Sequence, residues 1–361
     1  MAPVDLSGWT AVQPGSDAEH YLPATPVTVL WGRLPCAADE AVVELASGDV
    51  LTVDTLSHEG LLPDQGQDPL AYFAARGVPA HLVLDDAVEV ARTCRREPAD
   101  GPHVVTGPIR VDGARPGDLL RIDVLHLEPR VPYGVISNRH GRGALPGEYP
   151  QGPDAVSVFT AVEERDGGLV GVLPLREGGE RAARFPLAPF LGIMGVAAAG
   201  DERPHSVPPG AFGGNIDVKL LVEGASLLLP VQVDGALAYV GDPHFAQGDG
   251  EVALTALEAS LRATLRFTVV PAEQARAEWG EVRGPLIVTP ELLVPTGLDE
   301  DLDEAVKHCV RNAIELLHAR FGMDRHHALA YLSAATDFDI SQVVDLVKGV
   351  HARIRIADFD G

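Results

Sequence analysis

The sequence predicts an α+β fold that is predominantly β, with a β-sandwich-like N-terminal part, a further β-barrel or α+β portion, and short C-terminal helices. Its 38 glycines and 29 prolines exceed the usual combined share of about 12%. They follow no period, which indicates many turns between short strands. Residues 119–126 alternate between apolar and polar side chains, and apolar residues recur at helical spacing from residue 302 onward. The hydrophobic content of 46% is enough for a sizeable core.

The N-terminal part is predicted to hold short strands followed by two helices. The β-branched runs at 27–30 and 50–53 are bounded by proline and glycine, which is typical of strands. The segment 57–68 is rich in Gly, Pro and Asp and predicts a loop. A helix is expected over 69–76, because it begins with proline. A second is expected over 85–95, which begins with acids and ends with arginines.

The middle of the chain is predicted to be a series of further strands. The segment 252–270 fits both a helix and a strand, but its second half alternates between apolar and polar residues, so we predict a strand over 261–269. The dipeptide Asp234-Gly235 predicts that the two segments beside it form a hairpin. The other strands expected here are 119–126, 156–162, 169–173, 227–233 and 236–240.

Three helices are expected at the C-terminal end. The first covers 302–321, is led by acids and ends before a glycine, and the others cover 324–335 and 342–348. No linker separates independent domains. We expect a mostly β sandwich-like domain over 1–190 and a β-rich, site-bearing portion over 191–361 that closes with the helices, and the two can interleave.

The charge balance excludes several partners. With 28 Lys and Arg against 52 Asp and Glu, the formal net charge is −24, so binding to nucleic acid or to an anionic membrane is not expected. The three cysteines are widely spaced and cannot form a disulfide framework. The N-terminus shows no secretory signal, and no apolar run approaches the ~20 residues of a membrane helix. We therefore expect a cytoplasmic protein.

The densest group of polar side chains lies in GDPHFAQGDGE (241–251). Two carboxylates and an imidazole that converge there could hold a divalent metal, or one carboxylate could act as a general base. The alternative is an acidic surface turn after a hairpin, although ordinary turns rarely carry so many of these side chains. The polar residues of this segment are Asp242, His244, Gln247, Asp249 and Glu251.

Other candidate site residues are scattered along the chain. Asn215 and Asp217 lie two positions apart after a glycine pair, which suits either an oxygen ligand set or a hydrogen-bonded turn. His103 is a single loop histidine, and Asp54 ends a predicted strand, where site residues often lie. The pair His58-Glu59 lacks the second histidine of HExxH, which excludes zincin chemistry.

The loop SNRHGRG (137–143) concentrates positive charge in an otherwise acidic chain. It carries Arg139, His140 and Arg142 within four positions. Such a loop could hold an anion or order acidic groups.

No nucleophile elbow, phosphate-binding loop or dinucleotide fingerprint occurs in the sequence. Five segments instead resemble the acetamidase/formamidase family, in the family's order and over most of residues 27–355. They are GPHVVTGPIRVDGARPGDLL (101–120), PFLGIMGVA (189–197), PPGAFGGNID (208–217), LLLPVQVDGALAYVGDPHFAQGDGE (227–251) and QVVDLVKGV (342–350).

This resemblance implies a mostly β fold, a homo-oligomer, and hydrolysis of short aliphatic amides, of the formamide or acetamide type, to ammonia and a carboxylate. The loops 57–66 and 137–148 depart from the shorter bacterial acetamidases and could reshape the pocket. The residues that the resemblance assigns to the site are Asp54, His103, Asn215, Asp217, His244, Gln247, Asp249 and Glu251.

Because no Ser or Cys triad is evident, we expect a water activated by a divalent metal. The expected ligands are His244 and Asp217, helped by His103 or Asp54, with Zn²⁺ favoured by the imidazoles and Ca²⁺ as the alternative. Alternatives to a short-chain amidase are a hydrolase of a bulkier amide or another C–N bond, and a non-catalytic amide-binding module. The expected catalytic residues are Glu251 as the base, Asp249, and Asn215 or Gln247 to polarise the carbonyl.

Overall fold

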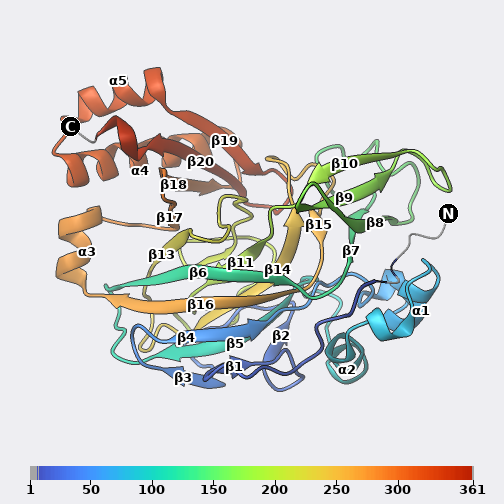
Figure 1. The fold of residues 1–361 in the computed structure, drawn as a ribbon. Coiled ribbons are helices and arrows are strands. Elements are labelled where there is room, and N and C mark those ends of the chain that lie inside the picture. Colours follow the sequence, from blue (N-terminus) through green and yellow to red (C-terminus); the bar gives the residue numbers. More distant parts are fainter. Residues whose placement is uncertain (1–5, 7, 360–361) are drawn as a thin grey trace.

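The computed structural model of the chain describes residue 6 and residues 8–359, which form two large β-sheets with helices at the periphery (Figure 1). From one edge to the other, sheet A consists of β1 (Tyr21–Leu22), β4 (Val50–Asp54), β16 (Leu261–Val270), β6 (Leu119–Pro129), β13 (Ser226–Pro230), β17 (Leu286–Val288), β18 (Leu292–Asp299), β20 (Lys348–Arg355) and β19 (Asp337–Gln342).

Sheet B runs in the same way through β10 (Ala182–Pro186), β9 (Gly168–Pro174), β8 (Val156–Arg165), β7 (Tyr133–Asn138), β15 (Leu257–Glu258), β14 (Ala238–Ala246), β11 (Phe190–Gly195) and β12 (Gly213–Asn215). Three more strands extend it at β14, namely β5 (Val104–Val111), β2 (Val29–Trp31) and β3 (Val43–Leu45). Here β5 pairs with β14, and both β2 and β3 pair with β5.

Each sheet combines strands from both sides of residue 190. In sheet A, β4 from the N-terminal part pairs with β16, and in sheet B, β5 pairs with β14. The predominantly β, α+β fold predicted from the sequence is confirmed, and residues 1–190 and 191–361 interleave in both sheets.

Four of the observed helices lie over segments where the sequence predicts a helix, whereas the helix over 272–279 was not predicted. Asp301 accepts hydrogen bonds from two backbone N–H groups at the start of α4 (Leu302–Phe321), and Gly322 ends that helix with a left-handed backbone. No helix in the described part of the chain is long and apolar enough to cross a membrane. The helices are α1 (Pro69–Ala74), α2 (Asp85–Thr93), α3 (Ala272–Trp279), α4 (Leu302–Phe321) and α5 (Arg325–Ala335), with short 3₁₀ turns η1 (Pro63–Gln65), η2 (Ala80–Leu82) and η3 (Ile356–Asp358).

Successive side chains of a strand point to opposite faces of the sheet, so one strand can contribute to two hydrophobic cores. In β13, Leu227 and Leu229 belong to the main core, which draws on strands of both sheets, whereas Leu228 belongs to a second core. The second core packs α3, α4 and α5 against the C-terminal strands of sheet A (Figure 1). The C-terminal helices therefore cover one end of sheet A, away from the core that the two sheets share.

Two predictions about local structure are wrong. The strands on either side of Asp234-Gly235 form no hairpin, because β13 pairs within sheet A and β14 within sheet B. The chain crosses between sheets there, with a left-handed backbone at Gly235, Ala236 and Leu237. The helix expected over 342–348 is also absent: this segment is the connection between β19 and β20. Both segments take their structure from pairing with distant strands, and a local sequence pattern does not reveal such pairing.

Candidate metal centre

Strand β14 places two potential ligands side by side at the centre of sheet B. Asp242 and His244 lie two positions apart, and both side chains are buried. The neighbouring strand β15 brings Glu258 directly opposite His244, and β11 lies on the other side of β14. Because β14 is an interior strand, its polar side chains are removed from bulk water and need partners from other segments.

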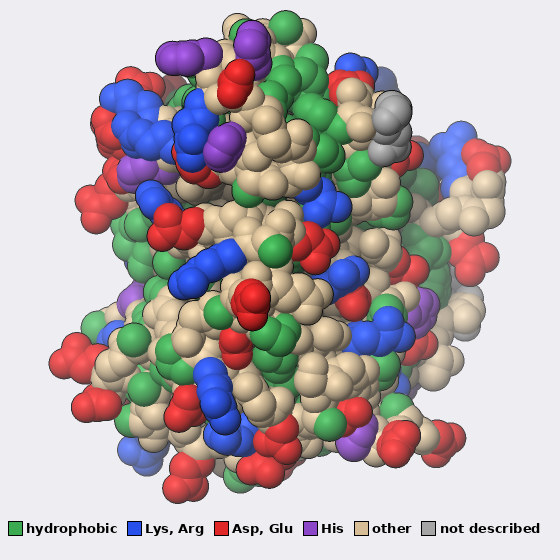
Figure 2. Space-filling view, turned by 90° about the vertical axis from the view of Figure 1, so that its left-hand side faces the viewer, with side chains coloured by type: hydrophobic (Ala, Val, Ile, Leu, Met, Phe, Trp, Pro, Cys, Tyr) green, Lys and Arg blue, Asp and Glu red, His purple; other side chains and the backbone are tan. Residues whose placement is uncertain are grey.

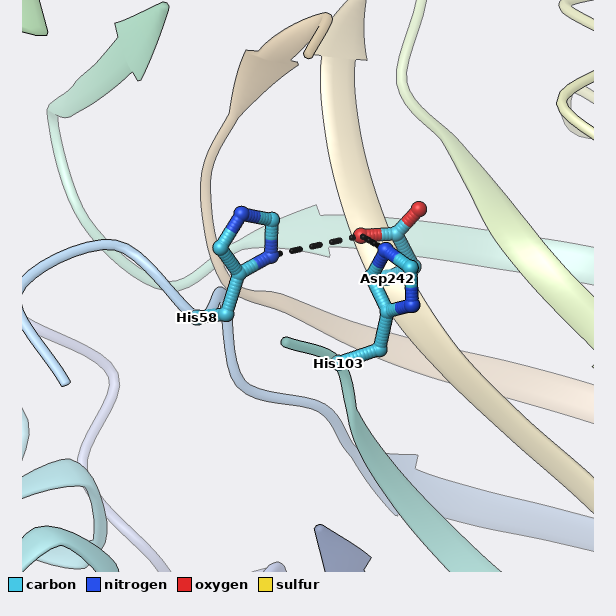
Figure 3. Close-up of side chains that lie close together, drawn as sticks. All are labelled: His58, His103 and Asp242. Atoms are coloured by element: carbon cyan, nitrogen blue, oxygen red, sulfur yellow. Dashed lines mark ion pairs between the residues drawn. The ribbon is translucent and has the colours of Figure 1, made fainter. Parts of the chain in front are cut away.

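A loop and the start of β5 complete the first group of ligands (Figure 3). His58 comes from the loop after β4, and His103 directly precedes β5. The Asp242 Oδ1 atom lies 3.6 Å from His58 Nδ1 and 3.8 Å from His103 Nε2. In Figure 3 both imidazoles face the carboxylate of Asp242 from separate segments.

These distances fit ligands around one ion better than they fit hydrogen bonds. Ligands bound tetrahedrally to zinc at about 2.0–2.1 Å lie roughly 3.3 Å apart, whereas hydrogen bonds are shorter than the distances seen here. The two nitrogens of His58 and the Oδ1 atom of Asp242 are buried and have no hydrogen-bond partner among the described residues. Buried polar atoms without partners are costly, so a cation that they share would remove that cost.

The two imidazoles are oriented by their surroundings. The Nδ1 atom of His103 lies 3.0 Å from Ser206 Oγ, which leaves Nε2 facing Asp242. Burial lowers the pKa of His103 to about 4, so its imidazole is neutral and its lone pair is available to a metal. The Nε2 atom of His58 lies 3.4 Å from Glu59 Oε1, so a carboxylate stands beside the imidazole without a hydrogen bond to it. A carboxylate beside a histidine commonly accompanies metal ligands.

Carboxylates are crowded on the other side of Asp242. The cluster continues through His244 to Glu258 and Glu251, and then to Asp217 and Asp345, all of them buried. Burial raises the pKa of Asp217 and of Glu251 well above their ordinary values, and repulsion from neighbouring carboxylates adds to the effect. Burial also raises the pKa of Asp345 to about 7. This part of the cluster therefore holds more carboxyl groups than can all be ionised at once without a cation.

Strained backbone occurs at three members of the cluster. Asp217, Asp242 and Glu251 have φ values of 48°, 50° and 45°, in the left-handed region that non-glycine residues rarely adopt. Such strain persists only where the surroundings enforce it, and it is frequent at functional sites. Gly192 in β11 is packed closely against the same cluster. A Cβ at this position would lie 2.7 Å from Asp242 Oδ2 and from His244 Cε1, so there is no room for a side chain.

A cavity of about 1220 Å³ opens onto this cluster. Its inner wall contains both imidazoles of the first group and the carboxylates of Asp242, Glu251, Glu258 and Asp345, together with the side chain of Asn215. Both loops that were expected to reshape the pocket line it, through residues 62–64 and 139–143. The loops are joined by Arg139, whose Nε lies 2.6 Å from Asp64 Oδ2.

Most residues that the sequence singled out meet at this site. His103, Asn215 and Glu251 line the cavity, and His244 and Asp217 lie in the buried cluster beside it. Asn215 Oδ1 and Glu251 Oε2 are buried without a hydrogen-bond partner among the described residues, so both are free to contact a bound molecule.

Three residues that the sequence singled out do not join the cluster. Asp54 is held by Arg262, with an Nε–Oδ1 distance of 2.7 Å, and takes part in structural ion pairing. Asp249 pairs with Lys219 Nζ at 2.6 Å outside the cavity. Gln247 donates from Nε2 to the carbonyl oxygens of Asp217 (2.8 Å) and Ser341 (3.1 Å), so it fixes the backbone of a cluster residue.

Four members of the cluster had no role assigned from the sequence. His58 was considered only as part of an incomplete HExxH pattern, and Asp242 was named within its segment without a role. Glu258 lies in the segment whose pattern fitted both helix and strand, and Asp345 lies where a helix was expected. For Asp242 the signal was available, since its spacing from His244 places both on one side of a strand. The other three depend on contacts between distant segments.

The model of the acetamidase/formamidase family matches this chain over residues 85–202 and 196–357. The chain belongs to the acetamidase/formamidase family. It is 28% identical over 305 residues to a formamidase from Methylophilus methylotrophus, covering 68% of this chain and 74% of that protein. It is 30% identical over 204 residues to an acetamidase from Mycolicibacterium smegmatis, covering 42% of this chain and 49%, about half, of that protein.

Solved structures share the fold of this chain. An acetamidase structure from Bacillus halodurans superposes with a TM-score of 0.72 at 25% identity, over 94% of this chain and 98% of that one. A gamma lactamase structure from Delftia acidovorans shares the fold with a TM-score of 0.53 at 22% identity, over 93% of this chain and 90% of that one.

Proposed function

We propose that this chain is a metal-dependent amidase that hydrolyses a linear amide C–N bond to ammonia and a carboxylate. The chain is an amidase by family, because its relatives carry the names acetamidase and formamidase. The observation that carries the metal-dependent mechanism is the group of His58, His103 and Asp242, whose facing atoms are buried or line the cavity and are spaced for a shared ion. Formamide and acetamide are the simplest substrates to test.

Two imidazoles and one carboxylate form a ligand set typical of a catalytic zinc site, with a further position left for water or substrate. When bound, a divalent cation would supply a Lewis acid that activates water and polarises the amide carbonyl. Zn²⁺ is favoured over Ca²⁺ because imidazole nitrogen makes up two of the three ligands. His244 and Asp217, which were expected to be ligands, then hold the cluster around Asp242 in place, and the Nε2 atom of His244 lies 3.1 Å from Asp242 Oδ2.

Glu251 serves as the general base in this proposal. Its carboxylate lines the cavity and has an oxygen with no partner among the described residues. It takes a proton from the attacking water and returns it to the departing nitrogen, so that water adds to the carbonyl carbon, the C–N bond breaks and ammonia leaves. Asn215 lines the same wall and can orient the amide through its side-chain amide group.

Metal content and ammonia release test this proposal together. We expect the purified protein to contain a divalent metal, and we expect chelation to abolish ammonia release from formamide or acetamide until zinc is restored. Glu251→Gln should keep the metal but lower kcat by about 10²- to 10⁴-fold, the usual contribution of a general base. Glu273→Gln, on the exposed surface of α3, is the matched control. Full activity both after chelation and in Glu251→Gln would refute the proposed mechanism.

A bulkier amide is the second candidate substrate, and the cavity favours it. Pockets for drug-sized ligands measure roughly 300–1,000 Å³, so a cavity of about 1220 Å³ has room for far more than a two-carbon amide. A panel of amides of increasing length separates the two candidates through kcat/KM.

Assembly and location stay predictions. We propose a homo-oligomer, as the family resemblance implies, and a cytoplasmic location, as the few, widely spaced cysteines favour. We expect neither nucleic acid nor a membrane as partner, because the chain carries a net charge of −24. Light scattering of the purified protein measures the subunit number.

A further inference from the structure

Three arginines line the same cavity as the buried cluster. They are Arg96, which follows α2, and Arg139 and Arg142 in the loop after β7, and we call them the arginine rim. Arg142 is exposed, whereas Arg96 and Arg139 are half-buried. Segments far apart in the sequence thus bring guanidinium groups to one wall of the cavity that opens onto the candidate metal centre.

The carboxylates around the arginine rim neutralise it only in part. Arg139 pairs with Asp64, and the nearby Asp100 is taken by Arg33, whose Nε lies 2.6 Å from its Oδ1. Arg96 instead donates to backbone carbonyls, from Nε to Gly101 (2.6 Å) and from Nη2 to Asp100 (2.8 Å).

Arg142 has no ion pair within residues 8–359. Lys348, which also lines the cavity, donates to the carbonyl oxygens of Glu300 and Leu346. Asp154, like Glu251 and Asp345, lines the cavity without an ion pair among the described residues. Outside the buried cluster, the lining holds four cations (Arg96, Arg139, Arg142 and Lys348) and three carboxylates (Asp64, Asp100 and Asp154), so positive charge is in excess there.

The guanidinium groups are close enough to repel one another. Burial lowers the pKa of Arg96, the carboxylates of Asp100 and Asp64 oppose this, and the positive charges of Arg142 and Arg139 lower the pKa further. A protein with 28 cations against 52 acids has no general reason to collect like charges at one place. On the face that carries the C-terminal helices, acidic and basic side chains are interspersed (Figure 2). Only partly neutralised arginines at one wall of a cavity are typical of a site that binds an anion.

We propose that the preferred substrate is an amide whose other end carries a carboxylate, and that the arginine rim binds this carboxylate. This inference rests on the amidase function proposed above, and it specifies the substrate class. The inner wall carries Asp242, Glu251, Glu258 and Asp345, so it disfavours the carboxylate end and favours the neutral amide. The two walls therefore orient such a substrate in one direction, with the amide facing the metal centre. Hydrolysis consumes one water and yields a dicarboxylate and ammonium.

The test compares amides of similar length that differ in charge. Ammonia release is measured with glutaramate and with hexanamide, for the wild type and for Arg142→Gln, Arg142→Lys and Arg266→Gln. We expect a higher kcat/KM for glutaramate in the wild type. The ratio of the two kcat/KM values should fall about three- to tenfold in Arg142→Gln, the range for a charge-assisted contact at a partly exposed site. Added salt should shrink the ratio in the wild type.

The other variants serve as controls. Arg142→Lys keeps a positive charge and should retain part of the preference, while Arg266→Gln removes an exposed arginine of β16 that does not line the cavity and should retain all of it. Equal kcat/KM for glutaramate and hexanamide in the wild type overturns the inference. So does an Arg142→Gln ratio that matches the wild type.

Failure of the amidase proposal gives a different result. In that case no amide of the panel releases ammonia, and calorimetry with glutarate tests the arginine rim alone. Binding that weakens in Arg142→Gln and not in Arg266→Gln supports the anion site. No binding to the wild type, or equal binding to Arg142→Gln, overturns it.

Discussion

His244 and Glu258 are cross-strand partners in β14 and β15, and the Nε2 atom of His244 lies 3.1 Å from Glu258 Oε1. The same nitrogen lies 3.1 Å from Asp242 Oδ2, so one imidazole stands between two carboxylates. The other oxygen of Asp242 faces His58 and His103. Sheet pairing thus fixes the carboxylate that completes the candidate metal-binding group.

Replacing His244 should weaken metal binding even where His244 is not itself a ligand. His244→Gln leaves Asp242 without the group that orients it, and losing such a supporting contact typically costs about 10- to 100-fold in metal affinity. Metal bound per chain after dialysis against a competing chelator measures the effect. His126→Gln, on an exposed side chain of sheet A, should retain the wild-type metal content. Equal retention by both variants would contradict the supporting role of His244.

Local patterns in the sequence predicted some features of this protein, and contacts between distant segments decided the rest. Helix α4 was predicted with its observed bounds, because its apolar spacing, the acids of its first turn and Gly322 are all local signals. Glu258 was not found, because its role depends on pairing with a strand that precedes it by over ten residues. Asp345 lies in a β connection whose apolar spacing resembles a helix. Asp54 does end a strand, as the sequence predicted. Its role is structural, because it pairs with arginines from distant segments.

A methyl group at position 192 should disturb the metal centre directly. The Cβ of Gly192→Ala would lie 2.7 Å from Asp242 Oδ2 and crowd Asp217, and neither side chain can move freely inside the sheet. Overpacking of this kind costs about 1–3 kcal/mol. We expect lower metal content and lower activity in a protein that still folds, as judged by circular dichroism and elemental analysis. Gly248→Ala, where nothing lies near the added methyl group, is the control. Wild-type metal content in Gly192→Ala would refute this account.

Asp54 should matter for stability and not for metal binding. Its carboxylate is fully buried and accepts from Arg262 Nε at 2.7 Å, while Arg130 Nη2 lies 3.5 Å away. Asp54→Asn leaves Arg262 without its counter-charge, while Arg130 keeps Asp86 at 2.8 Å, and breaking a buried pair costs about 3–5 kcal/mol. Denaturant unfolding should show this loss, while metal per folded chain stays at the wild-type level. Loss of metal at unchanged stability would return Asp54 to the ligand set.

The contact between Arg203 and Asp39 predicts a pH-dependent contribution to stability. Burial alone would raise the pKa of Asp39, but hydrogen bonds from Arg203 and from the backbone N–H of Cys36 outweigh burial and hold that pKa below its ordinary value of 3.8. A carboxylate whose pKa is lowered by folding stabilises the folded state at neutral pH, and that stabilisation is lost as the pH falls through the ordinary value and below.

Arg203→Gln should therefore lower the free energy of unfolding near neutral pH, by about 0.5–1 kcal/mol because Arg203 is half exposed. The difference from the wild type should shrink as the pH falls through 3.8 and below, because Asp39 becomes protonated first in the variant and then, at lower pH, in the wild type. Urea unfolding at a series of pH values measures it. Arg266→Gln removes an exposed arginine with no ion pair among the described residues and should show no such convergence. A constant or growing difference between Arg203→Gln and the wild type at low pH would show that the contact stabilises through packing and not through charge.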